Sequence, residues 1–471
     1  MITVIGLDGG PLAPYAAAAM ARASLVVGGQ RHLAAVPPIN GARTLVMGEL
    51  RPALDALAAH DGDAVVLASG DPGFFGIVRA LHARGLACTV IPAVSSVALA
   101  FARAGLPWDD AMVVSAHGRD LRRAVNVCRA HPKVAVLTGP GAGPAEIGAA
   151  LAGWHRRLIV CEHLGETGEQ VTECSPAAAE RRDWSDPNVL LVLMRTERKP
   201  PGSEPPDIPD VIMGLVGHEP HQSHDHEPAD SSGGVGNAGE PGKRGKPGWA
   251  WPHSPTTAGW ALAEDDFDSR DAVITKAEVR ALALARLAPG PGTLIWDVGA
   301  GTGSVGIECA RFGAAVIAVE RDERRCTRIM HNARRHNAEI RVVSGEAPDA
   351  LAGLPEPDAV FVGGGGPAVV AAVAKHHPHR IVVALAAMER TGQAHAALTS
   401  AGYTVDGTLI QAARLAPLPG DVHRLASTNP VFLLWATAGS PPAPDTPPAP
   451  GTQPESQPTP QSSGPSPGAA R

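Results

Sequence analysis

The sequence predicts an α/β protein built from two folded blocks, residues 1–196 and 258–438. Each block alternates short apolar runs with longer stretches rich in Ala, Leu and Arg, a pattern typical of a mainly parallel sheet covered by helices. Glycine-rich turns follow several of the apolar runs, as expected where strands lead into helices. Residues 197–257 and 439–471 are rich in Pro, Gly and Ser and cannot form a packed core, so we expect a disordered linker and a disordered tail.

Composition narrows the class of protein further. A chain of 471 residues and 48.3 kDa exceeds one typical core, and its net charge is −7. The six cysteines include no C-x-x-C pair, which suits a reducing cytosol and predicts neither a metal site nor a disulfide scaffold. The N-terminus enters a strand without a basic leader, and no apolar stretch reaches the ~20 residues that span a bilayer. We therefore expect a cytoplasmic protein with no membrane association.

In the first block, a strand begins at once with Ile2-Thr3-Val4-Ile5, and glycine-rich or small-residue turns recur at predicted strand ends. These turns and the runs before them occupy residues 4–11, 65–76, 90–96, 115–119 and 137–140. Any one of them is a common turn. Their order and spacing together are far less common by chance.

In the second block, Thr275 to Leu287 predicts an amphipathic helix, with Thr275 and Glu278 forming a capping box. Thr275 could serve only as the helix cap or could also contact a ligand, and the sequence leaves both roles open. Six strands are expected to follow, the last of which would complete the sheet, at residues 294–298, 315–319, 340–344, 358–362, 380–385 and 430–435.

The segment 294–303 is the most informative in the chain. An apolar run ends in Asp297, and Gly299, Gly301 and Gly303 then open the next helix. Glycines let a backbone approach a ligand closely at a helix N-terminus. Gly301, Gly303 and Gly306 also fit the dinucleotide pattern G-x-G-x-x-G, but there the first glycine follows the strand directly. The D-x-G-x-G-x-G arrangement, with Glu320 ending the next strand, instead resembles the S-adenosylmethionine pocket of class I methyltransferases.

The first block resembles the tetrapyrrole methylases, a two-lobed fold that also uses S-adenosylmethionine. Followed by a class I half with Ile274-Thr275-Lys276-x-Glu278-Val279-Arg280, it resembles the precorrin-6Y C5,15-methyltransferase (decarboxylating) family of cobalamin biosynthesis. The resemblance covers both blocks, about 375 residues. The block departs from the tetrapyrrole methylase pattern at Leu7-Asp8-Gly9, where that family usually shows G-x-G-P, and at Ala93, where glycine is usual. An added Cβ at Ala93 would crowd the ligand.

The resemblance implies a doubly wound, Rossmann-like second half and S-adenosylmethionine as the cofactor. It implies C5 methylation by residues 1–196, and C15 methylation with decarboxylation of the C12 acetate by residues 258–438, converting precorrin-6B to precorrin-8X. The implied donor contacts in the two halves are Thr275, Gly299, Ala300, Gly301, Thr302, Gly303, Glu320 and Ala347, and Asp71, Pro72, Ser95, Ser96 and Thr138. No catalytic residue is assigned, because the chemistry needs mainly alignment and exclusion of water.

Three other features of the sequence each have two interpretations that stay open. Arginines on one predicted helix face could hold substrate carboxylates or form a solvated face; they are Arg321, Arg324, Arg325, Arg328 and Arg335. Gly363 to Gly366 could leave room for a flat substrate or form a loop. Histidines in the linker could bind a divalent ion or reflect low complexity; they are His218, His221, His224 and His226.

Alternative functions remain open at this stage. An RNA methyltransferase is disfavoured because residues 258–438 carry 17 Lys+Arg against 19 Asp+Glu, without interleaved aromatic residues. A nicotinamide-dependent dehydrogenase is a second alternative, and it would catalyse hydride transfer instead. The same reactions on cobalt-precorrins, or a class I methyltransferase of another substrate with a non-catalytic N-terminal half, also fit. We expect a precorrin substrate, no nucleic acid or membrane partner, and a homo-oligomer, as the family suggests.

Overall fold

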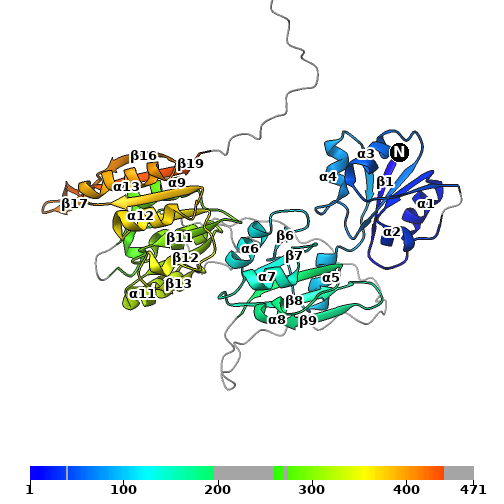
Figure 1. The fold of residues 1–471 in the computed structure, drawn as a ribbon, viewed down its shortest axis with the longest axis horizontal. Coiled ribbons are helices and arrows are strands. Elements are labelled where there is room, and N and C mark those ends of the chain that lie inside the picture. The colour runs from blue at the N-terminus through cyan, green and yellow to red at the C-terminus, as the bar shows by residue number, and fades with distance from the viewer. Residues whose placement is uncertain (39–40, 196–258, 270–273, 440–471) are drawn as a thin grey trace, which may run out of the picture.

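The structure is a computed structural model that describes residues 1–38, 41–195, 259–269 and 274–439. The predicted linker and all but the first residue of the predicted tail lie outside the described residues. The described chain forms an α/β protein, as the sequence predicts, and Figure 1 shows three α/β units in a row. The first two units make up the N-terminal half, and the third is the C-terminal half.

The first unit is a fully parallel sheet with strand order β3-β2-β4-β1-β5. Its strands are β1 Ile2–Leu7, β2 Leu25–Gly28, β3 Arg43–Val46, β4 Ala64–Ser69 and β5 Cys88–Ile91, and its helices are α1 Pro14–Arg22, α2 Gln30–Ala34, α3 Leu50–Ala58 and α4 Ile77–Ala83. The inner strands β1, β2 and β4 carry near-continuous runs of buried residues, because helices cover both faces of a parallel sheet.

The second unit corrects the expectation of a mainly parallel sheet. Its strand order is β6-β7-β10-β8-β9, and only β6 and β7 pair in parallel. Residues 163–169 are too short a connection for a crossover, so β8 and β9 must pair as a hairpin. The elements are α5 Ser96–Arg103, β6 Met112–Ser115, α6 Leu121–Ala130, β7 Lys133–Leu137, α7 Pro144–Ala150, β8 Arg156–Glu162, β9 Gln170–Cys174, α8 Pro176–Glu180 and β10 Asn188–Met194.

The C-terminal half is a doubly wound sheet with strand order β13-β12-β11-β14-β15-β19-β16. The switch in strand order falls between β11 and β14, where doubly wound folds place their ligands. The elements up to β15 are η1 Glu264–Asp266, α9 Ala277–Leu287, β11 Leu294–Val298, α10 Ser304–Arg311, β12 Ala315–Glu320, α11 Glu323–Arg335, β13 Arg341–Ser344, η2 Asp349–Leu351, β14 Ala359–Val362, α12 Gly366–Ala374 and β15 Arg380–Leu385.

The end of the chain adds strands that the sequence interpretation missed. The remaining elements are α13 Met388–Ser400, β16 Tyr403–Ile410, β17 Ala413–Leu418, β18 Val422–Ser427 and β19 Val431–Ala438. The last strand, β19, does not end the sheet, because β16 pairs on its outer side and both neighbours of β19 are antiparallel to it. The strands β17 and β18 form a separate hairpin that projects from the end of the molecule (Figure 1).

The predicted capping box at the start of α9 is wrong. Helix α9 begins at Ala277, its N-cap is Lys276, and no side chain of the cap residue closes it. The amide of Ala277 instead donates to Glu264 Oε1 at 2.8 Å, so a carboxylate from a separate segment caps the helix. Glu278 instead forms an ion pair with Arg414, whose Nη2 lies 2.6 Å from Glu278 Oε2.

The second unit contacts the C-terminal half through a largely polar interface. The guanidinium of Arg156, whose side chain is fully buried, pairs with Glu339. Asn126 Nδ2 lies 3.2 Å from both Gly292 O and Asp358 Oδ2. Trp154 packs into the apolar core of the C-terminal half. Separating the halves would take Glu339 away from the buried guanidinium of Arg156, and a buried charge without its partner is strongly destabilising. This interface therefore holds the halves in one arrangement.

Cleavage of the chain between residues 200 and 255 is therefore expected to leave two fragments that stay together. Glu339→Lys should separate them, because the new ammonium would face the buried Arg156. Gel filtration after limited proteolysis measures this directly. Glu389→Lys, an exposed change on α13, is the control and should leave the fragments associated. Separation of the wild-type fragments would contradict the interface.

Candidate active sites

The glycine turn of the C-terminal half lies at the carboxyl ends of β11 and β12. Gly299, Gly301 and Gly303 have φ angles of 72°, 60° and 76°, which side chains rarely adopt. Gly301 and Gly303 are buried, as is Thr302 between them, whereas Gly299 is exposed and Ala300 partly so. The turn is held from β12, since the amide of Gly299 donates to Val319 O at 2.9 Å. Glycine at these positions is thus required by the backbone itself.

Two buried carboxylates frame this turn. Asp297 Oδ2 accepts from the amide of Gly306 at 2.8 Å and so caps the first turn of α10. Its Oδ1 is buried and has no hydrogen-bond partner among the described residues. Burial, opposed by the Gly306 hydrogen bond, raises the pKa of Asp297 to about 7. Glu320 accepts from the amides of Gly301 at 2.9 Å and Asp322 at 3.1 Å.

These contacts leave acceptor capacity for a ligand. Each carboxylate oxygen can accept more than one hydrogen bond, so Glu320 can still receive hydroxyl groups. The unpartnered Asp297 Oδ1 can receive an N–H group or face a cation. An orphaned acceptor and a bare glycine backbone fit a cationic, hydroxyl-bearing ligand such as S-adenosylmethionine.

The predicted residues Ala347 and Thr275 lie on either side of this region in the chain. The amide of Gly345 donates to Glu320 O at 3.0 Å, so the turn that contains Ala347 lies beside the end of β12. Ala347 is half-buried and precedes Pro348 in a cis peptide. Thr275 lies just before α9, and its carbonyl accepts from Arg280 Nη1 at 2.6 Å. The structure thus brings the glycine turn, Glu320 and Ala347 together, and ties Thr275 to them through Arg280 and α10.

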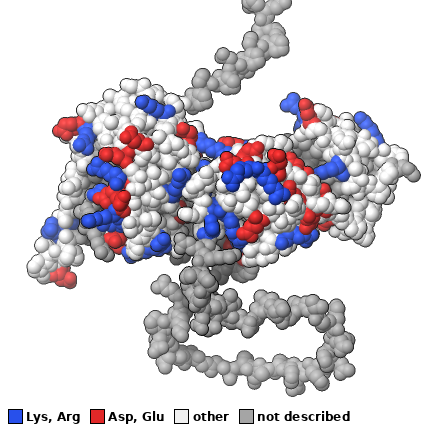
Figure 2. Space-filling view, turned by 60° about the horizontal axis from the view of Figure 1, so that its bottom comes forward, with Lys and Arg blue, Asp and Glu red and all other residues white. Residues whose placement is uncertain are grey.

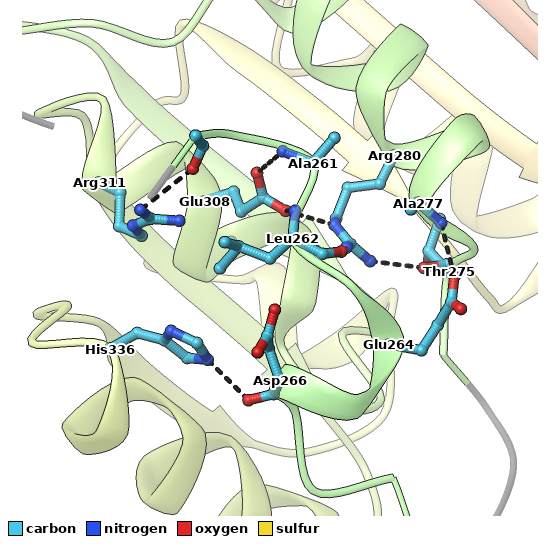
Figure 3. Close-up of polar contacts among 12 residues, drawn as sticks. Ala261, Leu262, Glu264, Asp266, Thr275, Ala277, Arg280, Glu308, Arg311 and His336 are labelled. Atoms are coloured by element: carbon cyan, nitrogen blue, oxygen red, sulfur yellow. Dashed lines mark hydrogen bonds and ion pairs between the residues drawn. The ribbon is translucent and has the colours of Figure 1, made fainter. Parts of the chain in front are cut away.

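A fully buried ion pair secures the segment before α9 (Figure 3). Arg280 Nε donates to Glu308 Oε1 at 2.5 Å, and both side chains are fully buried. Glu308 also accepts from the amides of Ala261 and Leu262, at 2.6 and 3.1 Å. Asn332 joins the same segment to the glycine turn, because its amide nitrogen donates to Asp268 O and to Thr302 O. We call residues 259–269 with Arg280 and Glu308 the clasp.

The glycine run after β14 packs against the glycine turn. A Cβ on Gly299 would lie 2.8 Å from Gly364 N, and a Cβ on Gly363 would lie 3.2 Å from Gly299 O. Gly365 and Gly366 have positive φ angles and begin α12. The run therefore serves close backbone approach and helix initiation, which accounts for at least three of its glycines without a substrate.

The N-terminal half contains a cleft of about 720 Å³ between its two lobes. Its walls come from the ends of β1 and β4 and from α2 in the first lobe, and from β7, β8 and β10 in the second. The lobes meet at one end of the cleft, where a Cβ on Gly9 would lie 2.0 Å from Gly165 O. This close approach explains glycine in the unusual Leu7-Asp8-Gly9 turn.

Two of the five residues predicted in this half line the cleft. Ser96 and Thr138 do so, and Thr138 Oγ1 contacts Asn188 O and Oδ1 at 2.6 and 2.7 Å. The other three belong to neighbouring turns. Asp71 Oδ1 accepts from the amide of Gly73, Pro72 is buried, and Ser95 caps α5 through the amide of Ala98. Ala93 is not among the described residues that line the cleft, and crowding of the ligand by its Cβ stays a prediction.

Sequence interpretation did not assign several residues of the cleft as ligand contacts, among them Arg31, His32, Ser69 and Glu166. The available signal was the pair Arg31-His32, which follows three residues after the end of an apolar run at Gly28. The predicted arginine stripe lies on the exposed face of α11 or just before it, where Arg321 lies 3.0 Å from Glu346. The linker histidines lie outside the described residues.

Two unlike α/β architectures in one chain define the class of protein: one has a cleft between two lobes, and the other has a glycine turn at its strand ends. Residues 3–179 match the model of the tetrapyrrole (corrin/porphyrin) methylases, and residues 266–438 match the precorrin methyltransferase domain. The chain is 34% identical over 384 residues to the precorrin-6Y C(5,15)-methyltransferase (decarboxylating) of a Sinorhizobium species, covering 78% of each chain. It is a methyltransferase.

Shorter relatives match part of the chain. A cobalt-precorrin-7 C(5)-methyltransferase of Salmonella typhimurium is 34% identical over 206 residues, which cover 41% of this chain and 98% of the relative. A cobalt-precorrin-6B C(15)-methyltransferase (decarboxylating) of the same organism is 37% identical over 170 residues, 34% of this chain and 87% of the relative. This chain belongs to the precorrin-6Y C5,15-methyltransferase (decarboxylating) family, whose members methylate and decarboxylate in cobalamin biosynthesis.

No helix among the described residues is long and apolar enough to cross a membrane.

Proposed function

We propose that this chain converts precorrin-6B to precorrin-8X by two methylations and one decarboxylation, with each half catalysing a separate part. The N-terminal half, residues 1–196, methylates C5. The C-terminal half, residues 258–438, methylates C15 and removes carbon dioxide from the C12 acetate. S-adenosylmethionine is the methyl donor in both halves.

One observation carries this division of labour. The two halves have separate ligand sites in separate sheets, namely the cleft between the N-terminal lobes and the glycine turn beside Asp297 and Glu320. Two relatives named for single activities, at C(5) and at C(15), support the same division.

In the C-terminal half, Glu320 would receive the donor's ribose hydroxyls, and the turn at Gly299 to Gly303 would face its amino-acid end. Ala347 would flank the adenine, and Thr275 would complete the pocket from the start of α9. Because Thr275 does not cap α9, the interpretation of Thr275 as a helix cap alone loses its basis. In the N-terminal half, Ser96 and Thr138 are the predicted residues on the cleft wall, while Asp71 and Pro72 follow the lining residue Gly70 in the chain and Ser95 precedes Ser96.

The donor supplies an activated methyl group as a sulfonium, so the protein's residues need to bind, align and exclude water. The test is incubation of the full chain with precorrin-6B and methyl-labelled S-adenosylmethionine, followed by mass spectrometry and carbon dioxide capture. Two labelled methyl groups and one carbon dioxide per product are expected. Calorimetric titration should give two donors bound per chain, whereas one would support a non-catalytic N-terminal half. The same assay with the cobalt-bound precorrin tests the alternative substrate.

A precorrin, and no nucleic acid, is the proposed partner. On the face shown in Figure 2, basic side chains are interspersed with acidic ones over both halves. Nucleic-acid sites usually gather Lys and Arg into one basic stripe. The mixed surface on this face therefore favours a small-molecule substrate.

A second copy of this chain is the proposed partner of the hairpin β17–β18. Leu415 and Leu425 face each other across the hairpin and are 74% and 67% exposed. Leu418 and Val422 form the next such pair and are also exposed. Exposed apolar pairs of this kind mark protein contacts, so we infer that the hairpin packs against another protomer.

Replacing Leu415 and Leu425 by glutamate together is expected to lower the oligomeric mass, because four charges would face each other in a dimeric contact. Light scattering after gel filtration measures the mass. Met388→Glu, at a side chain 71% exposed on α13, is the matched control and should leave the mass unchanged. A wild-type chain that is monomeric at micromolar concentration would refute the hairpin contact.

A further inference from the structure

Three polar side chains converge at the first-lobe wall of the N-terminal cleft. Arg31 and His32 lie on α2, and Ser69 is the last residue of β4. Ser69 Oγ lies 2.7 Å from Arg31 Nη2 and 2.8 Å from His32 Nε2. All three line the cleft, and Ser69 is exposed to it. None of the predicted donor contacts belongs to this cluster.

The cluster holds a neutral imidazole. Burial and the charge of Arg31 lower the pKa of His32 to about 4, while Glu166 opposes them. Arg31 Nη1 lies 3.9 Å from Glu166, whose other oxygen lies 3.5 Å from His163 Nδ1. The carboxylate of Asp8 belongs to the same cleft. At neutral pH, His32 therefore retains an unprotonated nitrogen.

The hydrogen-bond geometry leaves a route for a proton. Arg31 is always protonated and donates to Ser69 Oγ, which keeps its own hydrogen and one further lone pair. Among the described residues, His32 Nε2 is the only other group within hydrogen-bond distance of that oxygen, and His32 Nδ1 is buried there without a partner. Ser69 can pass its hydrogen to His32 as it accepts another from the cleft.

Methylation of a ring carbon requires that a proton leave. The ring carbon's electron pair forms the new bond to the methyl group, the sulfonium becomes a neutral thioether, and the macrocycle gains one positive charge. Loss of one proton from the macrocycle restores its charge. A base of low pKa suffices here, because a cationic ring is a strong acid compared with the neutral ring.

We propose that Ser69 and His32 form the proton-accepting pair for methylation in the N-terminal half. Ser69 takes the proton from the methylated macrocycle and gives its own hydroxyl hydrogen to His32 Nε2. His32 becomes an imidazolium and releases the proton to solvent after product leaves. This inference rests on the proposed function of the N-terminal half, and Arg31 acts as the positioning residue that orients Ser69.

The chain offers a matched control for this pair. Ser24 Oγ and His60 Nε2 also lie 2.8 Å apart, in the same lobe but not on the cleft wall. His60→Gln should therefore leave methylation unchanged. His32→Gln keeps a hydrogen-bonding group beside Ser69 but cannot carry a proton, and Ser69→Ala removes the relay oxygen.

In single-turnover assays with the C15-methylated, decarboxylated intermediate as substrate, His32→Gln should slow C5 methylation by about 10²–10⁴-fold. Ser69→Ala should also slow C5 methylation. The KM for this substrate and donor affinity should stay within about threefold of wild type, whereas a purely structural role would change them together. The wild-type rate should fall as pH approaches 4, and His32→Gln should lose this limb. Carbon dioxide release from precorrin-6B should be unchanged.

A readout independent of turnover is the imidazole titration of His32 by NMR with ¹⁵N-histidine, assigned by comparison with His32→Gln. A midpoint near 4 is expected, and Arg31→Gln should raise it because a neighbouring positive charge is lost. A wild-type rate for both His32→Gln and Ser69→Ala would overturn the proposal. If the wild-type chain adds no C5 methyl group, the proposed function of this half fails and this inference fails with it.

Discussion

Gly301→Asp is expected to abolish donor binding in the C-terminal half. Gly301 is buried at φ 60°, and its amide donates to Glu320. A side chain in this conformation costs roughly 1–2 kcal/mol, and a second carboxylate beside Glu320 adds like-charge repulsion of several kcal/mol. Because each ~1.4 kcal/mol is a factor of ten, donor affinity should fall by more than about a hundredfold. Carbon dioxide release should stop.

Calorimetry and two substrates separate the effects of this change. The wild-type chain should bind two donors and the variant one. Given precorrin-6B, the variant should release no carbon dioxide, but given the C15-methylated, decarboxylated intermediate it should still add the C5 methyl group. Gly301→Ala separates strain from charge and should be milder. Carbon dioxide release at the wild-type rate by Gly301→Asp would mean that the C-terminal half has been assigned the wrong reaction.

Glu320 has a larger role than donor contact alone. Its carboxylate also accepts from the amides of Gly301 and Asp322, so Glu320→Ala would loosen the turn as well as remove ribose hydrogen bonds. Each hydrogen bond to a charged acceptor contributes about 1.5–3 kcal/mol. Glu320→Gln keeps one oxygen acceptor and is the informative partner variant.

Local signals predicted the centre of the C-terminal half. A buried run that ends in Asp297, followed by glycines at alternate positions, left few arrangements other than a strand, a tight turn and a helix. Glu320 could be placed because β12 is the next strand in a doubly wound sheet. That these residues bind the donor stays a prediction.

Contacts between distant segments could not be predicted from the sequence pattern. Thr275 and Glu278 have the spacing of a capping box, yet Glu264 caps α9, because Arg414 from the hairpin β17–β18 binds both glutamates. The hydrogen bond from Arg414 lowers the pKa of Glu264 to about 2. The cluster of Arg31, His32 and Ser69 was missed for the same reason, since α2 and β4 meet only in the folded sheet.

The same limit applies to the interface between the halves. Arg156 and Glu339 are 183 positions apart, and neither stands in a motif. The sequence predicted two folded blocks joined by a long linker and no contact between them, whereas a buried guanidinium between the halves favours one arrangement. Chain connectivity alone is therefore a poor guide to how the halves act together.

Glu308→Ala is expected to destabilise the C-terminal half by about 3–5 kcal/mol, because it leaves the buried guanidinium of Arg280 without its carboxylate. The remaining partners of Arg280 are neutral, the carbonyls of Thr275 and Leu262. The amides of Ala261 and Leu262 also lose their acceptor, so the clasp should open. Because the clasp reaches the glycine turn through Asn332, donor affinity should fall in parallel.

Hydrogen exchange resolves this effect by segment, which matters because a chain of several domains does not unfold in one step. Residues 259–269 and the start of α9 should lose protection, while β1 to β5 should keep theirs. Glu346→Ala removes an exposed ion pair with Arg321 and is the control, worth at most about 1 kcal/mol. Arg280→Met combined with Glu308→Leu should recover much of the stability, since apolar replacement removes both desolvated charges. If the double variant recovers stability but donor affinity stays low, the clasp shapes the donor site beyond holding the fold; if Glu308→Ala costs less than about 1 kcal/mol, the pair is not buried as described.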